Sequence, residues 1–138
     1  MSNERAVRVE WTGTGMQFRG GGTNPVTPEI VVDGDGAEGP SPMLTLLLAA
    51  AGCTGSDIVD MFPKMRVTLT TLRIDVTGTR REEHPRRYVA LRLHFTLAGE
   101  GLDRAKAERA VGLSLEKYCS VVHSLAADIR VDHEITLV

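Results

Sequence analysis

The sequence predicts an α+β fold with antiparallel sheet, in one domain that covers all 138 residues. Three observations lead to this fold class. Several short segments alternate between apolar and polar residues, as half-buried strands do. One almost wholly apolar run, residues 43–53, follows a helix-capping sequence and is too long for an ordinary strand. Strand patterns lie both before and after this run, an order typical of α+β domains.

The first 33 residues are expected to form short strands. Apolar residues alternate with charged ones over residues 7–11, which predicts the first strand. The second is expected at residues 16–19, because the three consecutive glycines Gly20 to Gly22 follow it and break regular structure. A third strand at residues 30–32 is ended by the sequence Asp-Gly-Asp-Gly.

A buried helix is predicted over residues 41–65. Ser41 is a suitable N-cap, and the proline after it suits the first helical position. The apolar residues that follow surround the helix on all sides, so we expect most of its faces to be buried. Gly52 and Gly55 each cost about 1 kcal/mol relative to alanine inside a helix. Such a pair usually marks the close approach of another backbone or of a substrate.

The rest of the chain is predicted to return to strands and a second helix. Residues 67–98 alternate as a hairpin whose charged connection, residues 80–87, is exposed. Asp103 is expected to cap a second helical region over residues 103–127. A last strand is expected over residues 129–138.

The composition indicates a globular protein without a nucleic-acid or membrane partner. Hydrophobic residues make up 42% of the chain, charged residues 25%, and the formal net charge is −2. This charge does not suggest a nucleic-acid surface. The first thirty residues contain no apolar stretch long enough for a signal peptide, and the run 43–53 is too short to span a bilayer. We therefore expect a cytoplasmic protein.

The two cysteines, Cys53 and Cys119, are the main candidates for chemistry. They form neither a CxxC motif nor a disulfide framework, so each is either inert core or a reactive thiol. Free cysteine usually packs as a small hydrophobic residue, and this interpretation stays open for both. However, Gly52 precedes Cys53 and polar residues follow it, which suits a thiol that faces a cleft. If the two helices pack, the sulfurs could meet, provided that the Cα atoms lie within about 4.4–6.8 Å.

Metal binding is a competing use of Cys119. His123 stands four residues later on the same helical face, but no second close-spaced pair completes a tetrahedral site. We therefore expect no metal. A serine hydrolase is also disfavoured, because the sequence lacks a Gly-x-Ser-x-Gly elbow.

Three segments resemble motifs of the OsmC/Ohr family and occur in the family's order. The first runs from Ser41 through the leucine and alanine residues to Val59 and contains Cys53. The second is the charged segment 80–86, and the third is segment 113–121 around Cys119. The resemblance extends from about residue 39 to the C-terminus and is closer to the OsmC-like branch than to the Ohr branch.

This resemblance implies an OsmC-like fold, with antiparallel sheets wrapped around long buried helices in an intertwined homodimer. Two active sites would lie at the subunit interface. The resemblance also implies a helix break before the second cysteine, near Tyr118, where the apolar spacing alone predicts a continuous helix.

The activity that the resemblance implies is thiol-dependent reduction of organic hydroperoxides, with hydrogen peroxide reduced more slowly. Cys53 would attack the peroxide and become a sulfenic acid, and Cys119 would convert it to a disulfide. An external dithiol would restore both thiols, so no cofactor is expected. Apolar residues near Cys53 are expected to contact the substrate. They are Met43, Leu46, Met61 and Phe62.

The family also uses an arginine from the N-terminal region, held by a glutamate, to stabilise the reactive thiolate. Arg19 is the candidate arginine, with a solvated strand-end residue as the alternative. The usual glutamate position holds Leu44. The clamp is therefore absent or is supplied by another carboxylate, for which the candidates are Asp57, Glu10 and Glu29.

Two other functions stay open. A non-enzymatic OsmC-like protein could bind small apolar ligands in the same interface pocket. A hotdog-like thioesterase also wraps a helix in antiparallel sheet, but it would leave Cys119 without a role. Titration of thiols against an organic hydroperoxide separates these options, because only the peroxidase consumes two thiols per peroxide.

Overall fold

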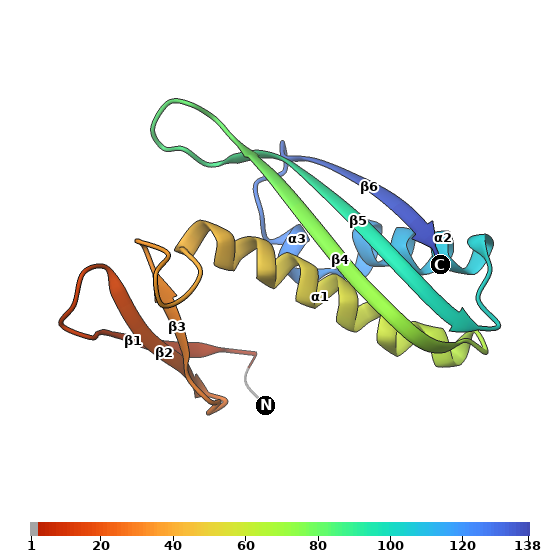
Figure 1. Ribbon diagram of the computed structural model, residues 1–138, viewed down its shortest axis with the longest axis horizontal. Coiled ribbons are helices and arrows are strands. Elements are labelled where there is room, and N and C mark those ends of the chain that lie inside the picture. The colour runs from red at the N-terminus through yellow and green to blue at the C-terminus, as the bar shows by residue number, and fades with distance from the viewer. Residues whose placement is uncertain (1–2) are drawn as a thin grey trace. The chain divides into compact units, whose positions relative to one another are not determined.

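The computed structural model describes residues 3–138, which form two sheets and a set of helices (Figure 1). The predicted α+β class is confirmed. The strands are β1 (Ala6–Trp11), β2 (Gln17–Asn24), β3 (Ile30–Asp33), β4 (Thr68–Arg80), β5 (Tyr88–Glu100) and β6 (Arg130–Leu137). The helical segments are α1 (Pro42–Lys64), α2 (Arg104–Leu113), the π-helical turn η1 (Ser114–Tyr118) and α3 (Ser120–His123). The chain divides into two compact units, Met1–Leu46 and Leu47–Val138, and each unit contains one of the sheets.

The N-terminal unit contains an antiparallel sheet in the order β1-β2-β3. The prediction that three glycines end the second strand is wrong, because Gly20 to Gly22 lie inside β2. A Cβ atom on Gly20 would overlap the carbonyl oxygen of Arg8 on β1, and one on Gly21 would come within 2.7 Å of the carbonyl oxygen of Pro28. The glycines are therefore needed for close backbone approach within the strand.

Helix α1 begins where the sequence predicts. The Ser41 hydroxyl oxygen accepts a hydrogen bond from the Leu44 N–H over 3.2 Å, as an N-cap does. Pro63 lies in the last turn, and the helix ends one residue later at Lys64. Its buried residues form one stripe, which comprises Leu47, Ala50, Thr54, Gly55, Ile58 and Phe62. Within the single chain, therefore, only one face of this apolar helix is buried.

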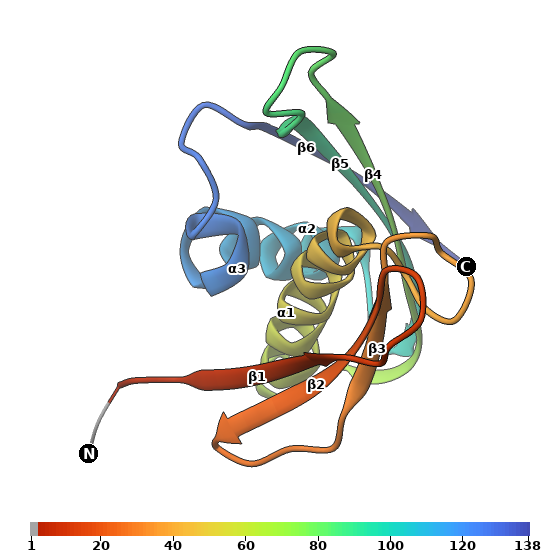
Figure 2. The same cartoon turned by 90° about the vertical axis from the view of Figure 1, so that its left-hand side faces the viewer.

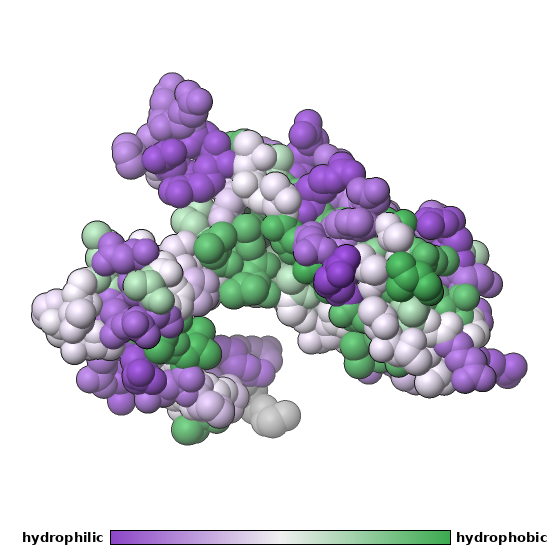
Figure 3. All heavy atoms as spheres, viewed as in Figure 1, coloured by the Kyte–Doolittle hydropathy of each residue, from purple (hydrophilic) through white to green (hydrophobic). Residues whose placement is uncertain are grey.

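The opposite face of α1 is apolar and exposed. Leu48 and Val59 are 59% and 55% exposed, and Figure 3 shows hydrophobic atoms at the surface over the first turns of the helix. A Cβ atom on Gly52 would have no neighbour within 4 Å, whereas one on Gly55 would lie 3.2 Å from Cδ1 of Ile74 on β4. Gly55 thus lies close to β4, and Gly52 faces open space.

By length and composition alone, α1 could also cross a membrane, since its 23 residues include a window with a mean hydropathy of 1.4. The helix is longer than the apolar run 43–53 from which the sequence predicted no membrane span. The core helix of a globular domain passes the same test. Within the described residues, 28% of this window is buried.

The C-terminal unit is built on the sheet β4-β5-β6. Alternate residues of the central strand β5 are almost completely buried and form the core, namely Leu91, Leu93, Phe95 and Leu97. β4 pairs with β5 as the predicted hairpin, but β6 runs parallel to β5, so the expected antiparallel pairing is wrong for this last strand. The helices between β5 and β6 form a crossover connection, which returns the chain in the same direction. Figure 2 shows α1, α2 and α3 on one face of this sheet.

The second helical region is interrupted. Asp103 caps α2 as predicted, and its carboxylate accepts a hydrogen bond from the Lys106 N–H over 2.8 Å. The helix then passes into η1, and Cys119 after it has an extended backbone, with φ −71° and ψ 98°. The break that the family resemblance implies near Tyr118 is confirmed. The continuous helix predicted from apolar spacing is wrong at this point.

Candidate active site

Cys53 lies in the middle of α1 as a free, half-buried thiol. The next residue, Thr54, is fully buried, and Gly52 before it is exposed. Cys53 therefore sits at the boundary between the buried stripe of α1 and its exposed face. A position in the middle of the helix gives the thiol no help from the positive end of the helix dipole.

Cys119 is brought to α1 by the π-helical turn. Its N–H donates to the carbonyl oxygen of Ser114, five residues earlier, over 2.7 Å, the pattern of a π-helix. The side chain then caps α3, where the sulfur accepts a long hydrogen bond from the Val122 N–H over 3.5 Å. Cys119 is 0% exposed, and the Thr54 hydroxyl on α1 donates to its sulfur over 3.3 Å.

The neighbouring Cys53 influences the ionisation of the Cys119 thiol. Burial raises the pKa of the Cys119 thiol, the hydrogen bonds from Thr54 and Val122 lower it, and the nearby Cys53 thiol raises it further. A raised pKa favours the protonated form of an acid. The surroundings of Cys119 therefore favour its neutral thiol.

Ser114 and Asp57 support this pair, and sequence reasoning missed their contact. Ser114 is 0% exposed, and its hydroxyl donates to the Asp57 carboxylate on α1 over 2.8 Å. The sequence signal for Asp57 is its place among the polar residues that follow Cys53. From this signal we expected Asp57 only as a candidate partner for the activating arginine. Ser114 gives no signal, because a single serine in a helical pattern looks like an exposed residue.

The four apolar residues predicted to contact substrate have different surroundings. Met61 is half-buried and lines a pocket of about 560 Å³ together with Asp57 and Tyr118. Phe62 is 0% exposed and belongs to the core. Met43 and Leu46 are half-buried residues of the first turns of α1 and belong to the N-terminal unit. Their expected contact with substrate stays a prediction.

The predicted activating arginine lies in the other unit. Arg19 is exposed on β2, directly opposite Glu10 of β1, and both line a small pocket to which Glu29 also contributes. Two of the three candidate carboxylates thus lie near Arg19. Leu44, at the family's glutamate position, is 54% exposed. Arg19 and Cys53 belong to different units, so their contact stays a prediction.

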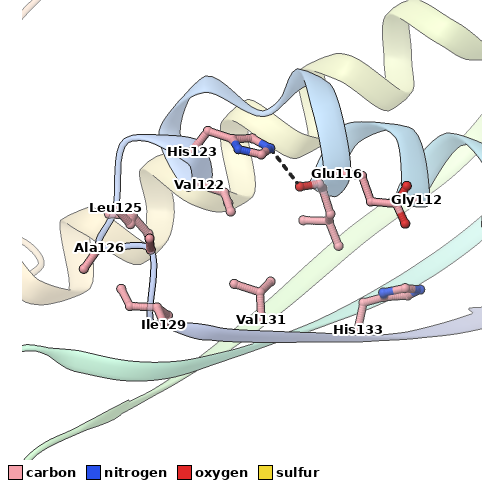
Figure 4. A pocket seen from close by; sticks show the side chains of 11 residues that line it. Gly112, Glu116, Val122, His123, Leu125, Ala126, Ile129, Val131 and His133 are labelled. Carbon is pink, nitrogen blue, oxygen red and sulfur yellow. Dashed lines mark hydrogen bonds between the residues drawn. The ribbon is translucent and has the colours of Figure 1, made fainter.

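A second pocket, of about 520 Å³, lies between the helical segments and β6 (Figure 4). Its described lining is mostly apolar, with His123 and His133, and includes neither cysteine. The His123 ring nitrogen Nε2 is hydrogen-bonded with the Leu115 carbonyl oxygen over 3.1 Å, whereas the Cys119 sulfur is engaged by Thr54 and Val122. Cys119 and His123, the two residues considered for a metal site, therefore contact different groups.

The thiol pair can carry out reversible disulfide chemistry. The half-buried Cys53 can meet an oxidant first, and the adjacent Cys119 can attack the oxidised sulfur. A mixed disulfide or a sulfenic acid on the first thiol is resolved in this way by a second thiol. Both thiols belong to the C-terminal unit, so this step requires no other chain.

Comparison with known proteins gives the family to which this sequence is similar. A family profile described as OsmC-like protein matches residues 34–134. Protein YhfA of Escherichia coli strain K12 is 38% identical over 133 residues, which cover 96% of this chain and 97% of that protein. An OsmC-like protein from Mycoplasma pneumoniae has a TM-score of 0.84 at 17% identity, covering 100% of this chain and 99% of its own.

The organic hydroperoxide resistance protein OhrB of Bacillus subtilis has a TM-score of 0.61 at 16% identity, covering 96% of this chain and 98% of its own. Both structural likenesses concern the fold. The family profile and the similarity to YhfA extend over most of the chain and confirm the resemblance seen in the three motifs. The chain therefore belongs to the OsmC-like protein family.

Proposed function

We propose that this protein is a thiol-dependent peroxidase that reduces organic hydroperoxides. The observation that carries the proposal is the placement of the buried Cys119 beside α1, where its sulfur accepts a hydrogen bond from Thr54, the neighbour of the half-buried Cys53. The family includes hydroperoxide-resistance proteins, and OhrB bears that name. An inert core cysteine would need no second thiol beside it and no break in the helix to bring that thiol there.

The first step oxidises Cys53. Its thiolate attacks the distal oxygen of the hydroperoxide, the O–O bond breaks, and the alkoxide takes a proton and leaves as an alcohol. The product on the protein is the Cys53 sulfenic acid. A cation beside Cys53 would stabilise the thiolate, and Arg19 is our candidate for this role.

The second step uses Cys119. Its thiol attacks the sulfenic sulfur of Cys53, a sulfur–sulfur bond forms, and the hydroxyl group leaves as water with the thiol proton. An external dithiol, in a reducing cytoplasm, then takes the disulfide and returns both thiols. Burial suits Cys119 to this role, because it keeps the second thiol away from peroxide until the sulfenic acid has formed.

The deciding experiment is a titration of the reduced protein with tert-butyl hydroperoxide. Wild-type protein should lose two thiols per peroxide and form a Cys53–Cys119 bridge within one chain. Cys53→Ser should consume no peroxide, whereas Cys119→Ser should stop at the sulfenic acid and proceed with excess peroxide to the sulfinic and sulfonic acids. Unchanged peroxide consumption by Cys53→Ser would refute the proposal. A ligand-binding protein or a thioesterase would lose no thiols at all.

A further inference from the structure

Two residues outside the thiol pair connect the two cysteines through the backbone. Asp57 lies one helical turn after Cys53 on α1, and it accepts the hydrogen bond of the Ser114 hydroxyl over 2.8 Å. The carbonyl oxygen of the same Ser114 accepts the N–H of Cys119 over 2.7 Å. One serine is thus held by the helix of the first cysteine and holds the backbone of the second.

We propose that Asp57 and Ser114 are positioning residues that set the register of the π-helical turn, so that Cys119 reaches Cys53 and closes the disulfide. This inference rests on the proposed function for its biological meaning. What Asp57 and Ser114 control is the rate at which Cys119 attacks an oxidised Cys53. This rate can be measured with any oxidant that reacts with Cys53.

The geometry explains why a hydrogen bond is needed at this place. A π-helical turn is rare and occurs mostly as a single turn within an α-helix. An ordinary α-helical continuation would place Cys119 at a different angle around the helix axis and remove its sulfur from Thr54. The bond from a buried hydroxyl to a carboxylate is charge-assisted, so it is stronger than one between neutral groups. It fixes the first residue of η1 against α1, and Cys119 follows directly after the last one.

The position of Asp57 also suits this role. It is half-buried and lines the pocket that contains Met61 and Tyr118. Asp60, in the same pocket, instead pairs with Lys64 over 3.1 Å, and its side chain is 72% exposed. The two carboxylates are one turn apart, but Asp57 accepts the Ser114 hydroxyl and Asp60 pairs with Lys64. Asp60 is therefore a matched control.

The experiment measures disulfide closure in two ways. The reduced protein is mixed with oxidised glutathione, which forms a mixed disulfide on Cys53, and closure then releases glutathione as the Cys53–Cys119 bond forms. A parallel reaction with tert-butyl hydroperoxide measures formation of the sulfenic acid and its conversion to the disulfide as separate steps. Thermal unfolding of each variant reports stability.

Asp57→Ala and Ser114→Ala should slow closure about tenfold or more with both oxidants, a factor that corresponds to about 1.4 kcal/mol. In Ser114→Ala, the reaction of Cys53 with hydroperoxide should keep its rate. Asp57→Asn should restore most of the closure rate, because its amide oxygen can still accept the Ser114 hydroxyl. Asp60→Ala should close as fast as the wild type.

Three outcomes would overturn the inference. They are closure at the wild-type rate in both alanine variants, closure in Asp57→Asn as slow as in Asp57→Ala, and no closure in the wild type with either oxidant. If Asp57→Ala fails to fold, Ser114→Ala and Asp57→Asn carry the test. Normal closure with glutathione but no reaction with hydroperoxide would refute the peroxidase proposal and leave the positioning role supported.

Discussion

The hydroxyl of Thr54 donates a hydrogen bond to the sulfur of Cys119 over 3.3 Å, although the residues are 65 positions apart in the sequence. Both side chains are 0% exposed. The bond joins the helix that carries Cys53 to the turn that carries Cys119. Thr54 therefore acts on the second thiol of the pair, although it is the sequence neighbour of the first.

Replacement of Thr54 by valine should raise the pKa of Cys119. The hydroxyl lowers this pKa by stabilising the thiolate, and valine has nearly the same shape without the donor. The titration is followed by thiolate absorbance in a Cys53→Ser background, so that only Cys119 titrates. We expect a loss of about 0.5–1.5 kcal/mol in the free energy of unfolding. Thr45→Val is the control, because the Thr45 hydroxyl donates to the Ser41 carbonyl oxygen instead.

The burial of Cys119 should make stability depend on alkaline pH. Its pKa is raised above the ordinary thiol value of 9.0, so the unfolded chain loses this proton at a lower pH than the folded chain. The stabilisation is fully present below the ordinary thiol pKa and is lost as pH rises through the folded value. Between the two values, this group should lower the free energy of unfolding by up to about 1.4 kcal/mol per pH unit. Denaturant titrations of the wild type and of Cys119→Ala test this. A slope as steep in Cys119→Ala would assign the effect to another group.

Much of this site follows from local sequence signals, and the rest depends on distant contacts. Ser41 and Asp103 are predictable caps because an N-cap requires only its own helix. The glycines of β2 looked like a chain break because their crowding comes from residues such as Pro28, which the local pattern does not show.

The π-helical turn has the same cause. The apolar spacing around Tyr118 fits a continuous helix, and the break depends on the contact of Ser114 with Asp57, which is distant in the sequence. The family resemblance supplied the break where periodicity could not. The parallel pairing of β6 with β5 likewise depends on how the helical crossover returns the chain to the sheet, which the local sequence pattern does not show.

Removal of the Arg19 guanidinium should slow the reaction of Cys53 with hydroperoxide. We expect Arg19→Ala to lower the second-order rate constant by at least about tenfold, which corresponds to about 1.4 kcal/mol of lost transition-state stabilisation. Arg8→Ala is the control, because Arg8 lines the same small pocket. Stopped-flow measurement under single-turnover conditions isolates this step.

An unchanged rate in Arg19→Ala would assign the activation to another cation, for which Arg80, Arg81 and Lys117 are candidates. Each of these has a contact of its own. Arg80 donates to the Arg86 carbonyl oxygen, Arg81 pairs with Glu83, and the Lys117 ammonium lies 5.3 Å from the centre of the Tyr118 ring.

Organic hydroperoxides should react faster than hydrogen peroxide. Met61 and Tyr118 offer apolar surface in a pocket beside Asp57, one turn from Cys53, and each Å² of apolar surface buried by a substrate contributes about 25 cal/mol. Met61→Ala should lower the rate constant with cumene hydroperoxide and leave that with hydrogen peroxide nearly unchanged. Equal rate constants for the two peroxides in the wild type would contradict this preference.

The exposed face of α1 should be covered by a second copy of the chain in an obligate homodimer. Leu48 and Val59 are three helical turns apart on this face and are 59% and 55% exposed, and Gly52 between them leaves open space. A charge at Leu48 would be buried without a partner, so Leu48→Asp should dissociate the dimer. Val138→Asp, at a 73% exposed terminal residue, is the control. Light scattering of the reduced proteins should give a dimeric mass for the wild type and the control and a lower mass for Leu48→Asp. A monomeric wild type would mean that this apolar face has another partner.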